Sequence, residues 1–207
     1  MVRKILPLLL VLACLSLTAC GEYGKVEQGR VVAFDKSTTP PTVTFIKDAG
    51  TDDKHPHYTV LPALTFSLPT DPAEVGQAPK VGLRLQLDVE AKIITMYDPS
   101  TKEFDKIPFE LVENHENVNV RKQHPLVYDR ETRKERSFPV VKADEQTVTI
   151  YSSRQQMLST IKLAPEYFQK YTDADWSAGD EIRIYFSEPG KCQRFMNVSQ
   201  TDFSKRK

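Results

Sequence analysis

Two histidines, His55 and His57, flank a proline in the run Asp52-Asp53-Lys54-His55-Pro56-His57. Two imidazoles with carboxylates close by are ligand types that zinc and copper accept in proteins. The positive charge of Lys54 opposes a metal ion in the same place, and a polar loop between strands explains the run equally well. The sequence therefore gives His55 and His57 as candidate metal ligands, with a solvated loop as the alternative.

Signatures of the common enzyme classes are missing from the sequence. It contains no G-x-S-x-G, no H-E-x-x-H, no C-x-x-C and no glycine-rich phosphate loop. Acidic pairs occur at Glu110 with Glu113 and at Asp173 with Asp175. Glycoside hydrolysis needs two carboxylates held at a set separation across a cleft, which proximity in the sequence does not supply. We therefore expect a non-enzymatic protein with no catalytic residue and no cofactor.

The N-terminus has the order of a secretion signal. Arg3 and Lys4 precede an almost wholly apolar run over residues 5–17. A helix needs about 20 such residues to span a bilayer core, so this run is too short for a transmembrane helix. It is followed by Leu17-Thr18-Ala19-Cys20, which resembles the lipobox of bacterial lipoproteins. The resemblance implies that residues 1–19 are a cleaved signal peptide and that lipid on the Cys20 thiol anchors the mature chain.

The residue after Cys20 is Gly21, not the Asp that resembles an inner-membrane retention signal in Gram-negative lipoproteins. The resemblance therefore implies the outer membrane, with the protein facing the periplasm. Residues 20–28 would form a short tether, since eight extended residues reach about 26 Å. The expected partners are the bilayer, through acyl chains on Cys20, and another envelope protein.

Composition limits the partners and the covalent chemistry of the mature chain. Removing residues 1–19 leaves 26 basic and 28 acidic residues, so there is no global positive charge to gather nucleic acid. Cys14 would leave with the signal and Cys20 would be lipidated, which leaves Cys192 without a disulfide partner. Cys192 is either a reactive thiol beside Lys191 and Arg194 or a small apolar core residue.

The elements that must position these residues are predicted to be strands. Apolar and polar residues alternate from Val81 to Val89, which is typical of a half-buried strand. Shorter β-prone runs cover 30–34, 42–46, 58–61, 93–97, 107–112, 118–120, 126–128, 138–141, 147–151 and 181–186.

Two connections and one helix interrupt these strands. Residues 97–103 and 128–135 each leave a strand through an Asp that can nucleate a hairpin turn. The second hairpin is rich in charge, and is either a solvated loop or a basic contact patch for an acidic partner or lipid headgroups. Residues 164–171 predict a short helix, with Pro165 at its start.

The chain also shows the pattern of a diverged internal duplication. Residues 31–35 and 42–45 correspond to 140–144 and 147–150, and residues 83–104 lie over 182–203 without a gap. In this register Cys192 falls on Ile93, an apolar position, which favours a buried thiol. We therefore predict a mainly β fold of two tandem barrel-like modules, SH3-like or OB-like, over residues 26–112 and 118–207.

The start of the mature chain, residues 20–32, resembles a family of short bacterial lipoproteins classed only as a domain of unknown function. The resemblance implies a cellular location but no activity. The sequence thus predicts an anchored lipoprotein that acts as a non-enzymatic binding module. The alternative is a small-ligand or metal-binding lipoprotein that uses the loop of His55 and His57.

Overall fold

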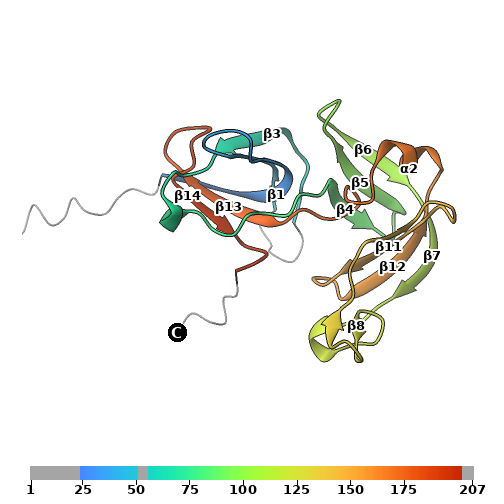
Figure 1. Cartoon of the computed structure of the whole chain (residues 1–207). Helices are drawn as coiled ribbons and strands as arrows, with labels where there is room; N and C mark the ends of the chain where they lie inside the picture. The colour runs from blue at the N-terminus through green and yellow to red at the C-terminus, as the bar shows by residue number, and fades with distance from the viewer. Residues whose placement is uncertain (1–23, 51–55, 202–207) are drawn as a thin grey trace, which may run out of the picture.

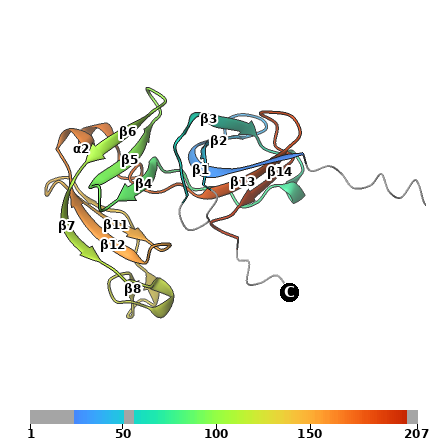
Figure 2. The same cartoon turned by 180° about the vertical axis from the view of Figure 1, so that it is seen from behind.

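The computed structural model describes residues 24–50 and 56–201, which form two β-rich units lying side by side (Figures 1 and 2). The first, here called the terminal unit, contains β1 (Lys25–Asp35), β2 (Thr42–Lys47), β3 (Val60–Ser67), β13 (Glu181–Phe186), β14 (Arg194–Asn197) and the 3-10 helix η3 (Pro72–Glu74). The second, the central unit, contains β4 (Arg84–Asp88), β5 (Ile93–Asp98), β6 (Glu103–Pro108), β7 (Glu110–His115), η4 (Val120–Lys122), β8 (Tyr128–Asp129), β9 (Lys134–Glu135), β10 (Val140–Lys142), β11 (Thr147–Ser152), β12 (Met157–Lys162) and α2 (Glu166–Lys170).

The terminal unit is built on one antiparallel sheet with the strand order β14-β13-β1-β2-β3. Alternate residues of each strand point to opposite faces, so every second side chain reaches the same core. That core consists of Val31, Val43, Phe45, Phe66, Leu68, Ile182, Ile184, Phe186, Cys192 and Phe195. Both ends of the described chain therefore stabilise one unit.

The central unit holds a sheet of order β4-β5-β6, a sheet of order β10-β11-β12-β7, and the small β8-β9 hairpin. Its core gathers side chains of β4 to β6 with those of β11 and β12, and fully buried Trp176 lies among them. Helix α2 follows Pro165 and precedes this tryptophan, and the ring of Phe168 lies 5.9 Å from that of Trp176. The aromatic residues around α2 thus close one end of the core.

Neighbouring residues of β1 join the two units. Val31 is buried in the core of the terminal unit, whereas Val32, on the opposite face of the strand, is buried in the core of the central unit. Ile46 and Tyr58 of the terminal unit belong to the central core as well. The junction is therefore packed through apolar side chains and is continuous with the larger core.

The prediction of a mainly β fold with one short helix is confirmed, and none of the described sheets closes into a barrel. The strand pairing crosses the predicted module boundaries, 26–112 and 118–207. β1 pairs with β13, with Arg30 opposite Glu181, so the first sheet takes strands from both halves of the chain. Strand β7 likewise pairs with β12. A periodic pattern indicates which face of a strand is buried, but not which strand lies beside it. The duplication itself stays a prediction.

The body of the protein begins earlier than the expected tether allows. β1 starts at Lys25, and the Glu27 carboxylate of that strand forms an ion pair with the Lys47 Nζ at 2.7 Å. The last residues of the expected tether, 20–28, are thus part of the sheet, while residues 20–23 lie outside the described ranges. The expected signal peptide, 1–19, and Cys20 also lie outside them. In the ranges that are described, no helix has the length and apolar composition needed to cross a membrane.

Both predicted hairpin loops are present, and they are built alike. The side chain of Asp98 accepts a hydrogen bond from the amide of Ser100, and that of Asp129 accepts one from the amide of Glu131. Four residues after each Asp, Lys102 or Arg133 adopts a positive φ, which lets the chain reverse. Not every expected strand is formed: residues 118–119 have no regular structure and Val120 begins η4, and of the expected strand 126–128 only Tyr128 belongs to a strand.

Asp98 links the β5–β6 hairpin to α2. Its carboxylate lies 2.7 Å from the Lys170 Nζ and accepts a hydrogen bond of 2.6 Å from the Ser100 hydroxyl. The bond from Lys170, followed by that from Ser100, holds the pKa of Asp98 well below its usual range. Lys170 also pairs with Asp105, which accepts a hydrogen bond from the Tyr171 hydroxyl at 2.6 Å.

This environment predicts a specific acid sensitivity. A carboxyl whose pKa is lowered by folding stabilises the fold above its unfolded pKa of about 4, and this contribution is lost as the pH falls further. Urea unfolding from pH 7 to pH 3 should therefore show a smaller acid-dependent loss of stability in Asp98→Asn than in the wild type. Asp144→Asn, at an exposed position, is the control. Parallel pH profiles for Asp98→Asn and the wild type would contradict the assignment.

Cys192 is buried with 8% of its surface exposed, as the duplication register predicts. Burial raises the pKa of its thiol to about 11. Because the thiolate is the reactive form, we expect native Cys192 to resist a maleimide at pH 7.5 and to react once the protein is unfolded in urea. Peptide mapping by mass spectrometry measures the two rates, and rapid labelling of the native protein would contradict the buried assignment.

Candidate functional site

The junction between the units is formed where two connecting segments cross. One runs into β4, the other into β13, and Leu83 forms an antiparallel bridge with Ala178. The Leu83 amide donates to the Asp175 carbonyl at 3.0 Å, and the Arg84 amide donates to the Ser177 carbonyl at 3.2 Å. These backbone bonds fix the positions from which Arg84 and Asp180 project.

Glycine is required at two points of this crossing. A Cβ atom on Gly82 would lie 2.2 Å from the Ser177 carbonyl oxygen, and one on Gly179 would lie 1.9 Å from the Val31 carbonyl oxygen. Both obstacles are backbone atoms, which cannot rotate away as a flexible side chain would. The close approach of the two segments therefore depends on the absence of a side chain.

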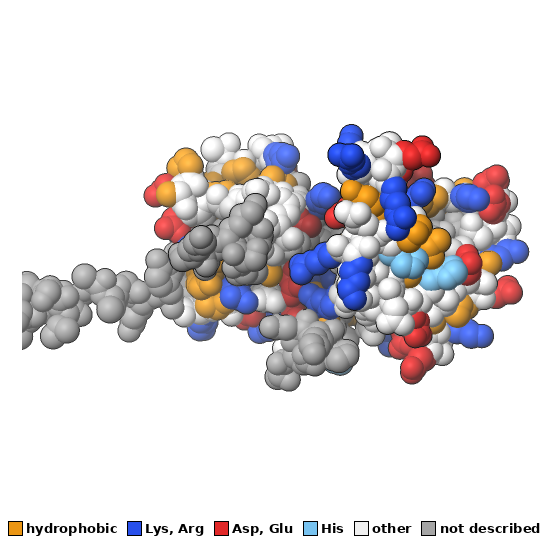
Figure 3. Space-filling model, turned by 90° about the horizontal axis from the view of Figure 1, so that it is seen from below, with side chains coloured by type: hydrophobic (Ala, Val, Ile, Leu, Met, Phe, Trp, Pro, Cys, Tyr) orange, Lys and Arg blue, Asp and Glu red, His pale blue; other side chains and the backbone are white. Residues whose placement is uncertain are grey.

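A pocket of about 520 Å³ opens beside the crossing and takes its walls from both units. The terminal unit contributes Arg30, His57, Asp180, Glu181 and Ser199, and the central unit contributes Arg84, Leu85, Leu87, Tyr151 and residues 152–155. Figure 3 shows Lys and Arg side chains gathering in the middle of the face seen from below. We call this cavity the junction pocket.

Two arginines of the junction pocket have no carboxylate partner among the described residues. The Arg30 Nη1 donates to the Leu85 carbonyl at 2.8 Å, and the Arg84 Nε donates to the Trp176 carbonyl at 2.9 Å. The Arg30 guanidinium also lies 4.5 Å from the ring centre of Tyr58, and its buried Nε has no hydrogen-bond partner within the described ranges. The fold therefore positions both groups through neutral partners.

The two guanidiniums oppose one another electrostatically. Burial, followed by the positive charge of Arg30, lowers the pKa of Arg84 to about 9. An arginine still remains protonated at neutral pH, so the cost appears as unneutralised charge in a partly desolvated place. An anion that entered the pocket would relieve this repulsion and would offer acceptors to the free guanidinium nitrogens.

The carboxylates in the pocket wall are already engaged. Glu181 accepts from the Arg154 Nη2 at 2.6 Å and from the side-chain amide of Gln28. Asp180 accepts through one oxygen from the Lys80 amide, the Asn197 side chain and the Gln200 side chain. The ion pair of Arg154 with Glu181 connects the β11–β12 turn with β13 and so holds the two walls together. The charges of Arg30 and Arg84 are not neutralised by a carboxylate within the described residues.

The predicted site residues are distributed differently. His57 lines the rim of the junction pocket, and its amide donates to the Asp48 side chain at 2.8 Å. His55 and Cys20 lie outside the described residues. Within the described ranges no group of three His, Cys, Asp or Glu side chains could hold a metal ion. The metal hypothesis for His55 and His57 therefore stays a prediction.

The other sequence candidates do not contribute to this pocket. Glu110 and Glu113 lie opposite Lys162 and Thr160 in the β7–β12 ladder and line no part of the pocket, and Glu113 contacts the His115 imidazole at 2.7 Å. Asp175 accepts hydrogen bonds from the amide and hydroxyl of Thr172. The arginines of the pocket carried no local signal, because they are far apart in the sequence and only the fold brings them together.

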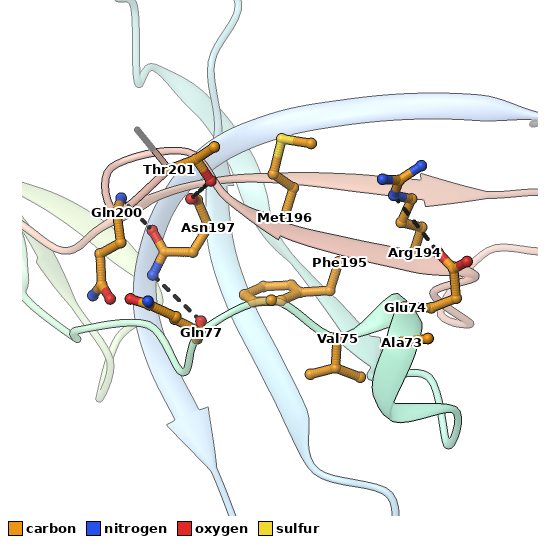
Figure 4. A pocket seen from close by; sticks show the side chains of 11 residues that line it. Ala73, Glu74, Val75, Gln77, Arg194, Phe195, Met196, Asn197, Gln200 and Thr201 are labelled. Atoms are coloured by element: carbon orange, nitrogen blue, oxygen red, sulfur yellow. Dashed lines mark hydrogen bonds and ion pairs between the residues drawn. The ribbon is translucent and has the colours of Figure 1, made fainter. Parts of the chain in front are cut away.

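A second cavity, of about 330 Å³, lies between η3 and β14 (Figure 4). Its charged residues, Glu74 and Arg194, face one another at 3.6 Å, and the Asn197 side chain donates to the Gln77 carbonyl. Figure 4 shows these groups directed toward each other across the cavity. Because Glu74 and Arg194 already neutralise each other, this cavity has less free charge to bind an ionic ligand than the junction pocket has.

Comparison with known proteins gives one match. The family model described as "Domain of unknown function (DUF4881)" covers residues 22–206. No curated protein and no solved structure shows a significant match to the chain.

Proposed function

The chain belongs to the DUF4881 family, a domain of unknown function, and we propose that it is a lipid-anchored envelope protein that binds an anionic ligand in the junction pocket without catalysing a reaction. The observation that carries the binding role is the pair Arg30 and Arg84, two guanidiniums in one pocket wall with no carboxylate partner among the described residues. The resemblance of residues 17–20 to a lipobox supports the anchor, and Gly21 in place of Asp after Cys20 supports the placement in the outer membrane facing the periplasm.

The ligand site is tested with acetate, the smallest carboxylate, at constant ionic strength. We expect acetate, but not an equal concentration of chloride, to raise the thermal unfolding midpoint, because a ligand that binds the folded state stabilises it. Arg84→Gln should weaken acetate binding about tenfold, the effect of losing one charge-assisted hydrogen bond.

Arg130→Gln is the matched control. It removes the same charge from the exposed β8–β9 hairpin, away from the pocket, and should leave acetate binding unchanged. Equal losses in both variants would mean that acetate responds to overall charge, and the junction pocket would then be rejected as the site.

The anchor is tested separately in the native host. Wild-type protein should partition into the detergent phase and carry acyl chains on the peptide that begins at Cys20, because several chains make membrane attachment effectively permanent. Cys20→Ser should lose both properties, and Cys14→Ser, within the expected signal, should keep them. Retention of Cys20→Ser in the detergent phase would overturn the lipoprotein assignment.

A protein partner in the envelope is part of the same proposal. The four-stranded sheet of the central unit has β10 at one edge and β7 at the other. Each edge strand carries an exposed valine, Val140 on β10 and Val112 on β7. An open edge of this kind can pair with a strand of a partner. A photo-cross-linker at Val112 should capture one partner in near-equal amount, while one at Lys102, in an exposed turn, should not.

A metal-binding role for the loop of His55 and His57 is the second candidate, and it is motivated by the two imidazoles that flank Pro56, with Asp52 and Asp53 close by in the sequence. Metal analysis of the purified mature protein decides it, with the double variant His55→Ala and His57→Ala as the control. Bound zinc or copper in the wild type alone would support the role, and metal-free protein in both forms would end it.

A further inference from the structure

The junction pocket adjoins another cavity, whose wall has a different chemical character. This neighbouring cavity of about 510 Å³ shares four wall residues with the junction pocket: Arg84, Tyr151, Ala178 and Asp180. The rest of its wall carries the apolar residues Val81, Phe138, Pro139 and Ile150, together with Ala174, Ser177 and the exposed Lys80. Arg84 therefore lines both cavities, with most of the charged residues on one side and the larger apolar residues on the other.

The apolar half is formed by parts of the central unit that pack firmly. The rings of Phe138 and Tyr151 lie 5.8 Å apart, and the Tyr151 hydroxyl donates to the Val118 carbonyl at 3.0 Å. Ile150 is almost fully buried, whereas Val81 is 41% exposed. A wall held in this way exists before a ligand arrives, and contact with an apolar chain would cover the exposed valine.

The net charge of the junction-pocket wall indicates how many negative charges a bound ligand should carry. The wall of the junction pocket contains Arg30, Arg84 and Arg154 together with Asp180 and Glu181, so it carries a formal charge of +1 when His57 is neutral, while Lys80 of the adjoining cavity is exposed to solvent. A single carboxylate balances this charge, whereas a doubly charged group would leave an excess in a partly desolvated pocket. Leu85 and Leu87 line the same half and extend the apolar contact toward the arginines.

We propose that the ligand is an amphipathic monoanion, a carboxylate with an apolar chain, whose carboxylate binds at Arg30 and Arg84 and whose chain lies against Val81, Phe138, Pro139 and Ile150. This inference rests on the proposed anion-binding function of the junction pocket and adds the class of ligand. Small-molecule sites commonly combine apolar walls with a few charged groups that fix orientation.

The test compares three probes by calorimetry on the mature protein: octanoate, acetate and octanol. Octanoate adds six methylenes to acetate, and burial of only part of them should tighten binding by about tenfold or more. Octanol has a similar chain without the charge and should bind more weakly than octanoate. Arg84→Gln should weaken octanoate and acetate alike, because both use the guanidinium.

Variants at exposed valines separate the two halves of the site. Val81→Ser should weaken octanoate at least twofold and leave acetate unchanged, since only the chain reaches the apolar wall. Val26→Ser, at a position 48% exposed and outside both cavities, should change neither. Circular dichroism before titration confirms that each variant is folded.

The outcomes distinguish this inference from the function on which it rests. Octanoate and acetate of equal affinity, or octanol as tight as octanoate, would overturn the amphipathic ligand. The first of these results would leave the anion site standing if Arg84→Gln still weakened binding. Failure of both octanoate and acetate to bind would overturn the anion site and the inference together.

Discussion

Gly179→Ala is expected to lower the free energy of unfolding by about 3 kcal/mol or more, at the upper end of the cost of overpacking. The added Cβ would lie 1.9 Å from the Val31 carbonyl oxygen, in the middle of β1 and therefore in the centre of the terminal sheet. Relief requires the segment before β13 to move away from β1. That movement would disturb the hydrogen bond from the Val31 amide to the Asp180 carbonyl.

Urea unfolding followed by far-UV circular dichroism measures the effect. Gly76→Ala is the matched control, because its Cβ would meet its nearest neighbours at 3.2 Å and needs only a small adjustment. We expect the control to stay within about 1 kcal/mol of the wild type. If Gly179→Ala were as stable as Gly76→Ala, the close crossing of the two segments would be wrong. Because Gly179 itself lines the junction pocket, Gly179→Ala should also weaken acetate binding in the fraction that folds.

The second large effect is expected for Trp176→Ala, with a loss of about 3–5 kcal/mol. Trp176 is fully buried, its ring lies 5.5 Å from that of Tyr171, and its carbonyl accepts the hydrogen bond from Arg84. Truncation would leave a large cavity in the larger core. Because the backbone carbonyl remains, the loss would come from packing and not from the hydrogen bond itself.

Trp176→Phe tests this explanation. The buried Nε1 of Trp176 has no hydrogen-bond partner within the described residues, so its removal eliminates an unsatisfied donor while most of the ring volume stays. We expect a loss of about 1–2 kcal/mol. Leu126→Ala, at a position 37% exposed, should change stability by less than about 0.5 kcal/mol. A Trp176→Ala variant as stable as Leu126→Ala would contradict the central position of the ring.

Much of the local structure could be predicted from periodicity and turn chemistry. The predicted strand 181–186 has the same first and last residues as β13. The strand expected from the alternation at 81–89 contains β4. Helix α2 lies inside the predicted range 164–171. The match with Ile93 correctly indicated that Cys192 is buried. Each of these features depends on residues that are close in the sequence, where the spacing of apolar side chains is informative.

The strand partners and the candidate site could not be predicted in the same way. Strand β1 forms ladders with both β2 and β13, although β13 lies near the other end of the chain. Alternation is the same whichever strand pairs with β1, so the sequence favoured two consecutive modules. The arginines at 30, 84 and 154 come from three separate segments, and none belongs to a recognisable motif.

The sequence by itself determined the β class, the hairpin turns, the short helix and the burial of Cys192, because each follows from local spacing and side-chain chemistry. It also supplied the expected location, through the resemblance of residues 17–20 to a lipobox. Only the tertiary structure decided that the two ends of the chain share a sheet and that Gly82 and Gly179 permit the crossing beside it. The junction pocket lies beside that crossing, since long-range packing alone brings Arg30 and Arg84 into one wall, where neither has a carboxylate partner among the described residues.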